Sequence, residues 1–242
     1  MKVRDLSNSI ILREIKKKPI AIIPIGSIEQ HGPHLPVSTD SDIISYIAKK
    51  VSEKTGFLLL PTIEYGVSFE HHPFFNMSIR SSTLEKVLMD LCVSLSKNKI
   101  TSIIILNGHH GNHKTVRKIP SKISNILGFK PKILVFSYWH FMKRKLDHAG
   151  FVETSIMRAI SKKVEMDKAV RGLIPDDLPK KKLANLQKLA NKSFISATKN
   201  GVWGDPTKAS ARVGRAILEE VITSIVKESQ TCLTGKTRKL HQ

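Results

Sequence analysis

The sequence predicts an α/β fold in which helices cover both faces of a mostly parallel β-sheet. Segments typical of strands alternate four times with segments of helical periodicity, as in α/β proteins. The clearest strands are continuous apolar runs such as "IAIIPIG" and "TSIIIL", which are typical of parallel strands buried on both faces. The 242 residues suffice for one hydrophobic core, so we expect a single domain over residues 1–242, with a frayed basic tail over about 230–242.

Each predicted strand is a short run of mainly apolar residues beside glycine, proline or polar residues. In chain order the strands cover residues 19–26, 57–66, 77–80, 101–106 and 131–139. Each predicted helix carries apolar residues at helical spacing. The helices cover residues 38–56, 81–98, 112–127, 151–163 and 207–229. Residues 165–205 are rich in turn-forming residues, and no pattern predicts their structure.

Two helix starts carry recognisable capping residues. Thr39, Asp40 or Ser41 would cap the first predicted helix, since short polar side chains accept hydrogen bonds from free backbone N–H groups. Ser82 and Glu85 have the spacing of a capping box.

The chain is strongly basic, with 40 Lys and Arg residues against 20 Asp and Glu residues and a formal net charge of +20. The charge is open to three interpretations: solvated faces, an anionic substrate, or a nucleic-acid partner. No recognition-helix, RNP or zinc-finger pattern accompanies this charge, which weighs against nucleic-acid binding. A basic nucleic-acid-binding protein is the alternative function from another class. No apolar run approaches the roughly 18 residues that cross a bilayer, and the N-terminal segment lacks a signal-peptide core, so we expect a cytoplasmic protein without a membrane partner.

Two histidine-rich segments begin where predicted strands end. "GSIEQHGPHLPVSTD" follows the first strand and holds Glu29, His31, His34 and Asp40, and "NGHHGN" follows "TSIIIL". In sheets of parallel strands, ligands bind beyond the carboxyl ends of the strands. Imidazole and carboxylate groups are ligands of divalent transition metals. The sequence therefore predicts a metal site at this edge of the sheet.

Each of these residues alone also has an ordinary structural explanation. Asp40 suits a helix cap, Glu29 suits a surface position, and His31 and His34 suit loop positions that bond to the backbone. The four residues become informative only together, because they gather within twelve positions of one loop.

The later segments raise the same choice. His109 and His110 are adjacent, so we expect only His109 to reach a metal and His110 to line the substrate pocket or face solvent. "HAGFVETS" supplies His148 and Glu153. Glu153 falls in the first turn of a predicted helix, where the helix dipole favours a carboxylate without any metal.

Four motifs together resemble the creatininase (creatinine amidohydrolase) family: "PIGSIEQHGPHLPVSTD", "NGHHGN", "HAGFVETS" and "GVWGDPTKAS". They span nearly the whole chain, and the first is long and specific. The resemblance implies a three-layer α/β/α fold with a mostly parallel central sheet, a centre of two divalent metals, and hydrolysis of an amide or formamide C–N bond outside peptides. It also implies a homo-oligomer, since family members form hexamers.

By position, the metal ligands that the resemblance implies are Glu29, His31, Asp40, His109 and Glu153, with Asp40 bridging the two metals. In creatininase itself a glutamate two residues after the "NGH" histidine is also a ligand, whereas this chain has Gly111. Glu153 is therefore the expected replacement. The usual family motif is "NGHGGN", so His110 stands where glycine is usual and the pocket should differ in shape.

The implied chemistry is attack by a hydroxide that two metals generate from a shared water. His148 is the expected proton shuttle to the leaving amine, beside Glu153, with a structural role next to the ligands as the alternative. Glu70 and His71 are expected in the substrate wall. Trp203 would stack on a flat heterocycle, or else be a buried structural residue. Zn, Mn or Fe(II) would suit such ligands.

The family offers three substrates. They are creatinine, a formylamino-pyrimidine ribonucleotide that is deformylated in flavin and deazaflavin synthesis, and a redox-cofactor precursor peptide. A basic protein gains nothing electrostatically from creatinine, whereas it attracts a phosphorylated substrate. Together with Gly111, this favours 2-amino-5-formylamino-6-ribosylaminopyrimidin-4(3H)-one 5'-monophosphate, with creatinine hydrolysis or precursor peptidase activity as the alternatives.

Overall fold

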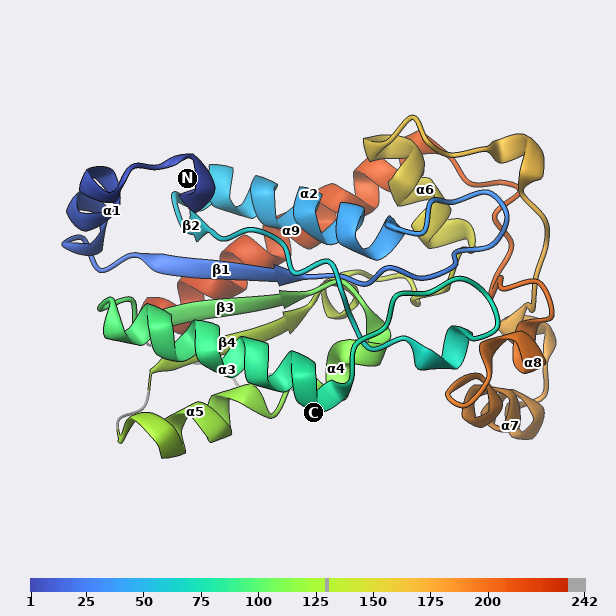
Figure 1. The fold of residues 1–242 in the computed structure, drawn as a ribbon. Helices are drawn as coiled ribbons and strands as arrows, with labels where there is room; N and C mark the ends of the chain where they lie inside the picture. The colour runs from blue at the N-terminus through green and yellow to red at the C-terminus, as the bar shows by residue number, and fades with distance from the viewer. Residues whose placement is uncertain (129–130, 235–242) are drawn as a thin grey trace.

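The computed structural model describes residues 1–128 and 131–234, and it confirms the three-layer α/β/α prediction. Four parallel strands form one sheet in the order β2-β1-β3-β4. The strands are β1 (Ile20–Ile25), β2 (Leu58–Leu59), β3 (Ser102–Asn107) and β4 (Lys132–Ser137). Helices lie on both faces of this sheet (Figure 1).

The α-helices of the described residues are α1 (Asn8–Ile15), α2 (Thr39–Thr55), α3 (Ser81–Lys97), α4 (His113–Val116), α5 (Ile119–Leu127), α6 (Phe151–Ile160), α7 (Lys180–Ala190), α8 (Phe194–Thr198) and α9 (Ala211–Thr234). Helices α2, α6 and α9 cover one face of the sheet, and α3 and α5 cover the other (Figure 1). Helices α7 and α8 lie apart from both layers, beyond the carboxyl ends of the strands (Figure 1). Within the described ranges, no helix is both long and apolar enough to span a bilayer.

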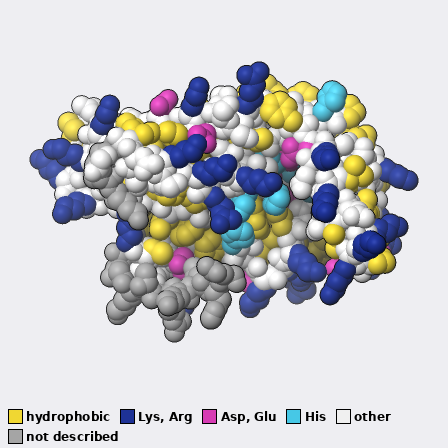
Figure 2. Space-filling model, turned by 90° about the horizontal axis from the view of Figure 1, so that it is seen from below, with side chains coloured by type: hydrophobic (Ala, Val, Ile, Leu, Met, Phe, Trp, Pro, Cys, Tyr) yellow, Lys and Arg dark blue, Asp and Glu magenta, His cyan; other side chains and the backbone are white. Residues whose placement is uncertain are grey.

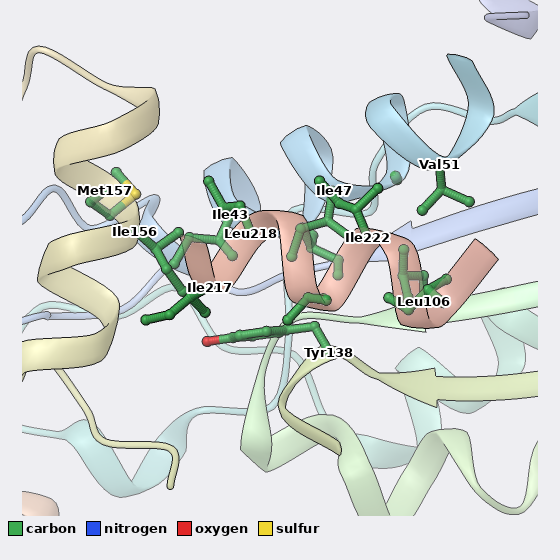
Figure 3. Close-up of a cluster of buried hydrophobic side chains, with 14 of the residues drawn as sticks. Ile43, Ile47, Val51, Leu106, Tyr138, Ile156, Met157, Ile217, Leu218 and Ile222 are labelled. Carbon is green, nitrogen blue, oxygen red and sulfur yellow. The ribbon is translucent and has the colours of Figure 1, made fainter. Parts of the chain in front are cut away.

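The strands feed two hydrophobic cores because successive side chains point to opposite faces. Ile22 and Ile104 pack under α2, α6 and α9, whereas Ile23 and Ile105 pack under α3 and α5. Figure 3 shows the first core, where the fully buried ring of Tyr138 lies beside the α9 side chains. This burial on both faces explains why the strand sequences are continuously apolar.

The second predicted strand is shorter than expected, and the third is not formed. Only Leu58–Leu59 pair as a strand, because Pro61 and the facing Pro24 lack backbone N–H groups and interrupt the ladder. The segment 77–80 is not a strand in the structure, so that prediction is wrong. Its Met77 and Ile79 N–H groups donate single hydrogen bonds to loop carbonyls.

Two helix predictions and the prediction of a frayed tail also need correction. The helix expected over 112–127 is broken between Val116 and Ile119, because Pro120 can occupy only the first turn of a helix. The terminal helix begins at Ala211, four residues later than expected, and continues to Thr234, so residues 230–234 are helical rather than frayed. The remainder of the expected tail, 235–242, lies outside the described residues.

The capping predictions are wrong in a way that matters for the site. Helix α2 has Ser38 at its N-cap position and no side-chain cap, so Asp40 lies inside the first turn with its carboxylate free for another role. The capping box of Ser82 and Glu85 is not formed, since α3 begins at Ser81, and Glu85 instead pairs with Lys122.

Candidate metal centre

The sheet register brings the two histidine-rich segments to one edge. Ile25 of β1 pairs with Asn107 of β3, and Asn107 pairs with Ser137 of β4, so three strands end at the same level. The loops that follow them therefore start side by side. The close approach of α2 requires Gly26, because a Cβ at that position would lie 2.3 Å from Ser41 Oγ.

A cavity of about 490 Å³ opens at this edge. It is lined by residues from six regions of the chain: Glu29, Asp40, Glu70, His71, Gly108, His109, His110, Gly111, Trp139, Leu146, Asp147, His148, Glu153, Gln187, Ala190, Asn191, Phe194 and Trp203. The prediction that distant segments converge at the carboxyl edge of the sheet therefore agrees with the geometry.

Asp40 lies between two histidines from different loops. Its Oδ1 is 3.4 Å from His31 Nε2, and its Oδ2 is 2.9 Å from His109 Nδ1. Two further carboxylates lie beside these histidines: Glu153 Oε2 is 3.6 Å from His31 Nε2, and Glu29 Oε2 is 3.3 Å from His109 Nε2. All five side chains are almost fully buried. The five predicted ligands thus form one cluster with Asp40 at its centre.

The second nitrogen of each histidine faces a backbone carbonyl. His31 Nδ1 lies 3.1 Å from the carbonyl of Glu29, and His109 Nε2 lies 2.9 Å from the carbonyl of Val67. A ring nitrogen beside a carbonyl carries the proton, which leaves His31 Nε2 and His109 Nδ1 as the metal-binding nitrogens beside Asp40. Metal-ligating histidines are usually oriented in this manner.

Three buried atoms of the cluster make no hydrogen bond among the described residues, although each lies within ion-pair distance of a neighbour: Glu29 Oε1, His31 Nε2 and Asp40 Oδ2. Leaving a buried polar atom unpaired costs about 1–3 kcal/mol. Imidazole and carboxylate atoms that face one another without bonding suit divalent cations. Three overlapping groups, Glu29–His31–Asp40, His31–His148–Glu153 and Glu29–His71–His148, each place their ligand atoms within 4.8 Å of one another, and His109 adjoins them through Asp40.

In the absence of metal, raised pKa values keep protons on side chains of the cluster to which cations would bind. Burial alone would lower the pKa values of His31 and His109, but Asp40 and the neighbouring glutamates raise both to about 10. Burial raises the pKa of Glu153 to about 8. Asp40, although buried, has a pKa well below its ordinary value because both histidines hold it ionised.

His148 is positioned to exchange a proton. Its Nε2 lies 3.0 Å from the backbone carbonyl of Gln30 and 3.1 Å from the side-chain Nε2 of Gln30, and in the tautomer that serves the shorter contact Nε2 carries the proton and donates to the carbonyl. Nδ1 is then the basic nitrogen, and it lies 3.8 Å from Glu29 Oε1. Burial and the nearby His31 and His71 lower the pKa of His148 well below its ordinary value, so the ring is neutral at pH 7.

His71 belongs to the cluster as well as to the cavity wall. Its Nε2 is 3.2 Å from Glu29 Oε1, and its ring stacks on Phe194 with 4.6 Å between centroids. Glu70 also lines the cavity, as predicted, and burial raises its pKa. Gly111 has no room for a side chain, because a Cβ there would lie 2.1 Å from the carbonyl of Val67. A glutamate at this position, which the family resemblance suggests, therefore does not fit this backbone.

The remaining predicted residues divide into two groups. His110 and Trp203 line the cavity, and Trp203 also exchanges two backbone hydrogen bonds with His148 (3.0 and 2.8 Å). His34 does not belong to the cluster: it is buried, its Nε2 lies 2.8 Å from Thr154 Oγ1, and burial lowers its pKa to about 4. His34 is therefore a core histidine.

The sequence analysis missed several residues that hold the site. Gln30 Nε2 lies 2.9 Å from His71 Nδ1 and 3.1 Å from His148 Nε2, and its position next to Glu29 was the available signal. Asp147 accepts hydrogen bonds from the backbone N–H groups of Val152 and Glu153, as a helix-capping aspartate does. Nothing in the sequence indicated that α7 and α8 supply a wall of the cavity.

Buried imidazole and carboxylate groups around a cavity at the carboxyl edge of a parallel sheet define a metal-dependent hydrolase. The family model described as "Creatininase: Creatinine amidohydrolase" matches residues 5–228. The chain belongs to the creatininase family. Membership confirms the predicted class, a metal-dependent hydrolase acting on C–N bonds other than peptide bonds, in preference to a nucleic-acid-binding protein.

Three comparisons illustrate the range of the family. The chain is 32% identical to the mycofactocin precursor peptide peptidase of Mycolicibacterium smegmatis, over 84% of this chain and 81% of that protein. It is 29% identical to the 2-amino-5-formylamino-6-ribosylaminopyrimidin-4(3H)-one 5'-monophosphate deformylase of Methanocaldococcus infernus, over 94% of this chain and 98% of that protein. A creatininase variant of known structure, described as zinc–zinc type, shares the fold with a TM-score of 0.81 and 23% identity, over 94% and 96% of the two chains.

Proposed function

We propose that the protein is a two-metal formamide hydrolase whose ligands are Glu29, His31, Asp40, His109 and Glu153. The observation that carries this proposal is the position of Asp40, whose two oxygens face histidines from two different loops. A carboxylate with one oxygen toward each of two sites suits a bridging ligand. Glu153 beside His31 would complete one site, and Glu29, whose ligand atom lies in one group with those of His31 and Asp40, would complete the other.

Two bound divalent ions would supply a water of lowered pKa and would polarise the substrate carbonyl. The chain's own residues would manage the protons. His148 presents the unprotonated Nδ1 beside Glu29. This nitrogen would accept a proton and then donate it to the leaving nitrogen of the substrate. Gln30 and the backbone of Trp203 would hold the His148 ring in place.

We infer a phosphorylated formylamino-pyrimidine nucleotide as the substrate. The deformylase relative aligns over nearly the full length of both chains, and the net charge of +20 favours an anionic substrate. Gly111 supports a different ligand arrangement from that of creatininase. Trp203 and Trp139 line the cavity and offer aromatic surfaces to a flat heterocycle.

The metal of the zinc–zinc creatininase neighbour makes zinc the first metal to test, and manganese and Fe(II) suit the same ligands. A second candidate function is trimming of a precursor peptide, because the mycofactocin peptidase is 32% identical to the chain. Creatinine hydrolysis is the third.

One experiment separates these functions. Protein loaded with zinc, manganese or Fe(II) is given the formylamino-pyrimidine nucleotide, creatinine, or a precursor peptide, and formate, creatine or the released fragment is measured. The proposal predicts formate release with about two metals per chain. Turnover of the peptide or of creatinine without formate release would replace the proposed substrate.

A further inference from the structure

A second group of histidines lies next to the metal centre and takes no part in it. His110, His113 and His140 gather around Trp139, with ring centroids 5.9, 6.0 and 5.7 Å from the Trp139 ring, respectively. His113 lies 5.3 Å from His140 and 6.5 Å from His110, centroid to centroid. These three histidines are called the histidine cluster below.

The histidine cluster adjoins the cavity. His110 and Trp139 line the cavity, and His110 directly follows His109 in the chain. His110 and His140 are exposed and His113 is half-buried, so the cluster is accessible from solvent. Figure 2 shows histidine side chains gathered on one face of the molecule, with Lys and Arg side chains around them.

The charged groups around the histidine cluster are basic. The positive charge of Lys114 repels a proton on His110, and that of Arg117 repels protons on His113 and His140. The negative charge of Glu29, which belongs to the metal centre, attracts a proton to His110. A bound anion would supply the missing negative charge.

The cavity itself is lined by the carboxylates of Glu29, Asp40, Glu70, Asp147 and Glu153, and the histidine cluster reaches it through His110. The cavity and the histidine cluster therefore differ in charge. A molecule that reaches from the metal centre to the histidine cluster would carry its reacting C–N bond at the first end and an anionic group at the second. Opposed charges at the two ends would also fix the direction in which such a molecule binds.

A buried hydrogen-bond chain orients His113 as a donor. Asn107 Nδ2 donates to Ser137 Oγ, 3.1 Å away, and Ser137 Oγ lies 3.1 Å from His113 Nδ1. In the tautomer in which Ser137 is the donor, its hydroxyl proton is given to His113 Nδ1. His113 then carries its proton on Nε2 and donates from that atom. The same Asn107 accepts a bond from the His109 backbone, so the chain joins the metal centre to the histidine cluster.

The cluster does not repeat the chemistry of the metal centre. Within residues 1–128 and 131–234, the groups whose ligand atoms lie close enough to hold a metal do not include His110, His113 and His140 together. Ammonium and guanidinium groups bind phosphate through charge-assisted hydrogen bonds, and a neutral imidazole adds an N–H donor.

We propose that His110, His113 and His140, with Lys114 and Arg117, form the subsite that binds the phosphate group of a phosphomonoester substrate. This inference rests on the proposed function, which identifies the reacting end of the substrate. It adds the place where the phosphate group of the substrate binds. The subsite selects phosphorylated over dephosphorylated substrates.

The test compares the holoenzyme with H113Q/H140Q, with K114Q/R117Q, and with K162Q/K163Q as a charge-matched control away from the cavity. Each protein is assayed on the formylamino-pyrimidine nucleotide and on its dephosphorylated nucleoside, and each is titrated calorimetrically with inorganic phosphate. For both cluster variants we expect KM for the nucleotide to rise about tenfold or more, a rise larger than that for the nucleoside, and phosphate affinity to fall by a similar factor. The control should match the unmodified enzyme within about twofold.

Unchanged KM and unchanged phosphate affinity in both cluster variants would overturn the subsite. The exposed K114Q/R117Q pair keeps the test decisive if H113Q/H140Q does not fold. Equal losses on nucleotide and nucleoside would also overturn the subsite, since they would indicate a general structural defect. If the unmodified enzyme releases no formate, the proposed function fails, whereas the phosphate titrations still decide whether the cluster binds an anion.

Discussion

The metal side and the α7–α8 side of the cavity are built in different ways. The metal side comes from strand ends and first helical turns, where the sheet register fixes each side chain and buried hydrogen bonds orient it. The α7–α8 side contributes Gln187, Ala190, Asn191 and Phe194, and it reaches the centre chiefly through the ring of Phe194. The difference suggests that the metal side performs the chemistry and that the α7–α8 side shapes access to it.

Replacing Asp40, at the centre of the metal side, should have the largest effect on metal content and activity. In D40N, the loss of negative charge between the two histidines should remove the metals and reduce activity to that of the metal-free protein. Metal content and turnover are measured on the same preparation. The control is D42N on the same helix, where Asp42 only accepts a hydrogen bond from Ser38. Full metal occupancy in D40N would show that Asp40 is not a ligand.

Replacing the proton shuttle should separate chemistry from metal binding. H148Q should keep both metals and lose about 10²–10⁴-fold in kcat, the usual contribution of general acid–base catalysis. The exposed His72 provides the control, H72Q, which should be unaffected. Loss of metal from H148Q would instead make His148 a ligand, as its place in the group with His31 and Glu153 also allows.

Metal binding to the metal side should release protons. In the metal-free protein His31 and His109 have pKa values of about 10 and Glu153 of about 8, so all three hold protons at pH 7. A cation must displace these protons, so metal affinity should rise with pH, by about tenfold per pH unit for each proton released. Calorimetry in two buffers of different ionisation enthalpy measures the proton count. Identical heats in both buffers would contradict the assignment.

Changing the α7–α8 side should have a smaller effect. Phe194 contacts the rings of His71 and His148, with centroids 4.6 Å apart in each case. F194A should lower kcat/KM by about tenfold while metal content stays the same, because the histidines lose packing and the ligands remain in place. The exposed Phe69 offers the control F69A. A loss of activity in F194A as large as that in D40N would contradict the functional difference between the metal side and the α7–α8 side.

The same comparison explains what the sequence could predict. Glu29, His31, Asp40 and His109 lie in short segments directly after apolar strands, so residue type and the expected strand order suffice to bring them to one edge of the sheet. Asp40 was open to two interpretations, and the structure shows that it is not the cap of α2.

The α7–α8 wall could not be predicted for physical reasons. Helix α7 is short, rich in lysine and mostly exposed, and α8 has only five residues, too few to show a helical period. Gln187 and Asn191 are ordinary surface residue types, and only their tertiary position brings them to the cavity. The break at Pro120 and the interruption of β2 at Pro61 were visible in the sequence, since proline cannot donate a backbone hydrogen bond.

The central claim is tested most directly by a crystal structure of the metal-loaded protein, with anomalous diffraction recorded at the absorption edge of the metal. We predict two anomalous peaks per chain on either side of the Asp40 carboxylate, one beside His31 and Glu153 and the other beside His109 and Glu29. A single peak, or peaks away from Asp40 in an active preparation, would contradict the two-metal centre.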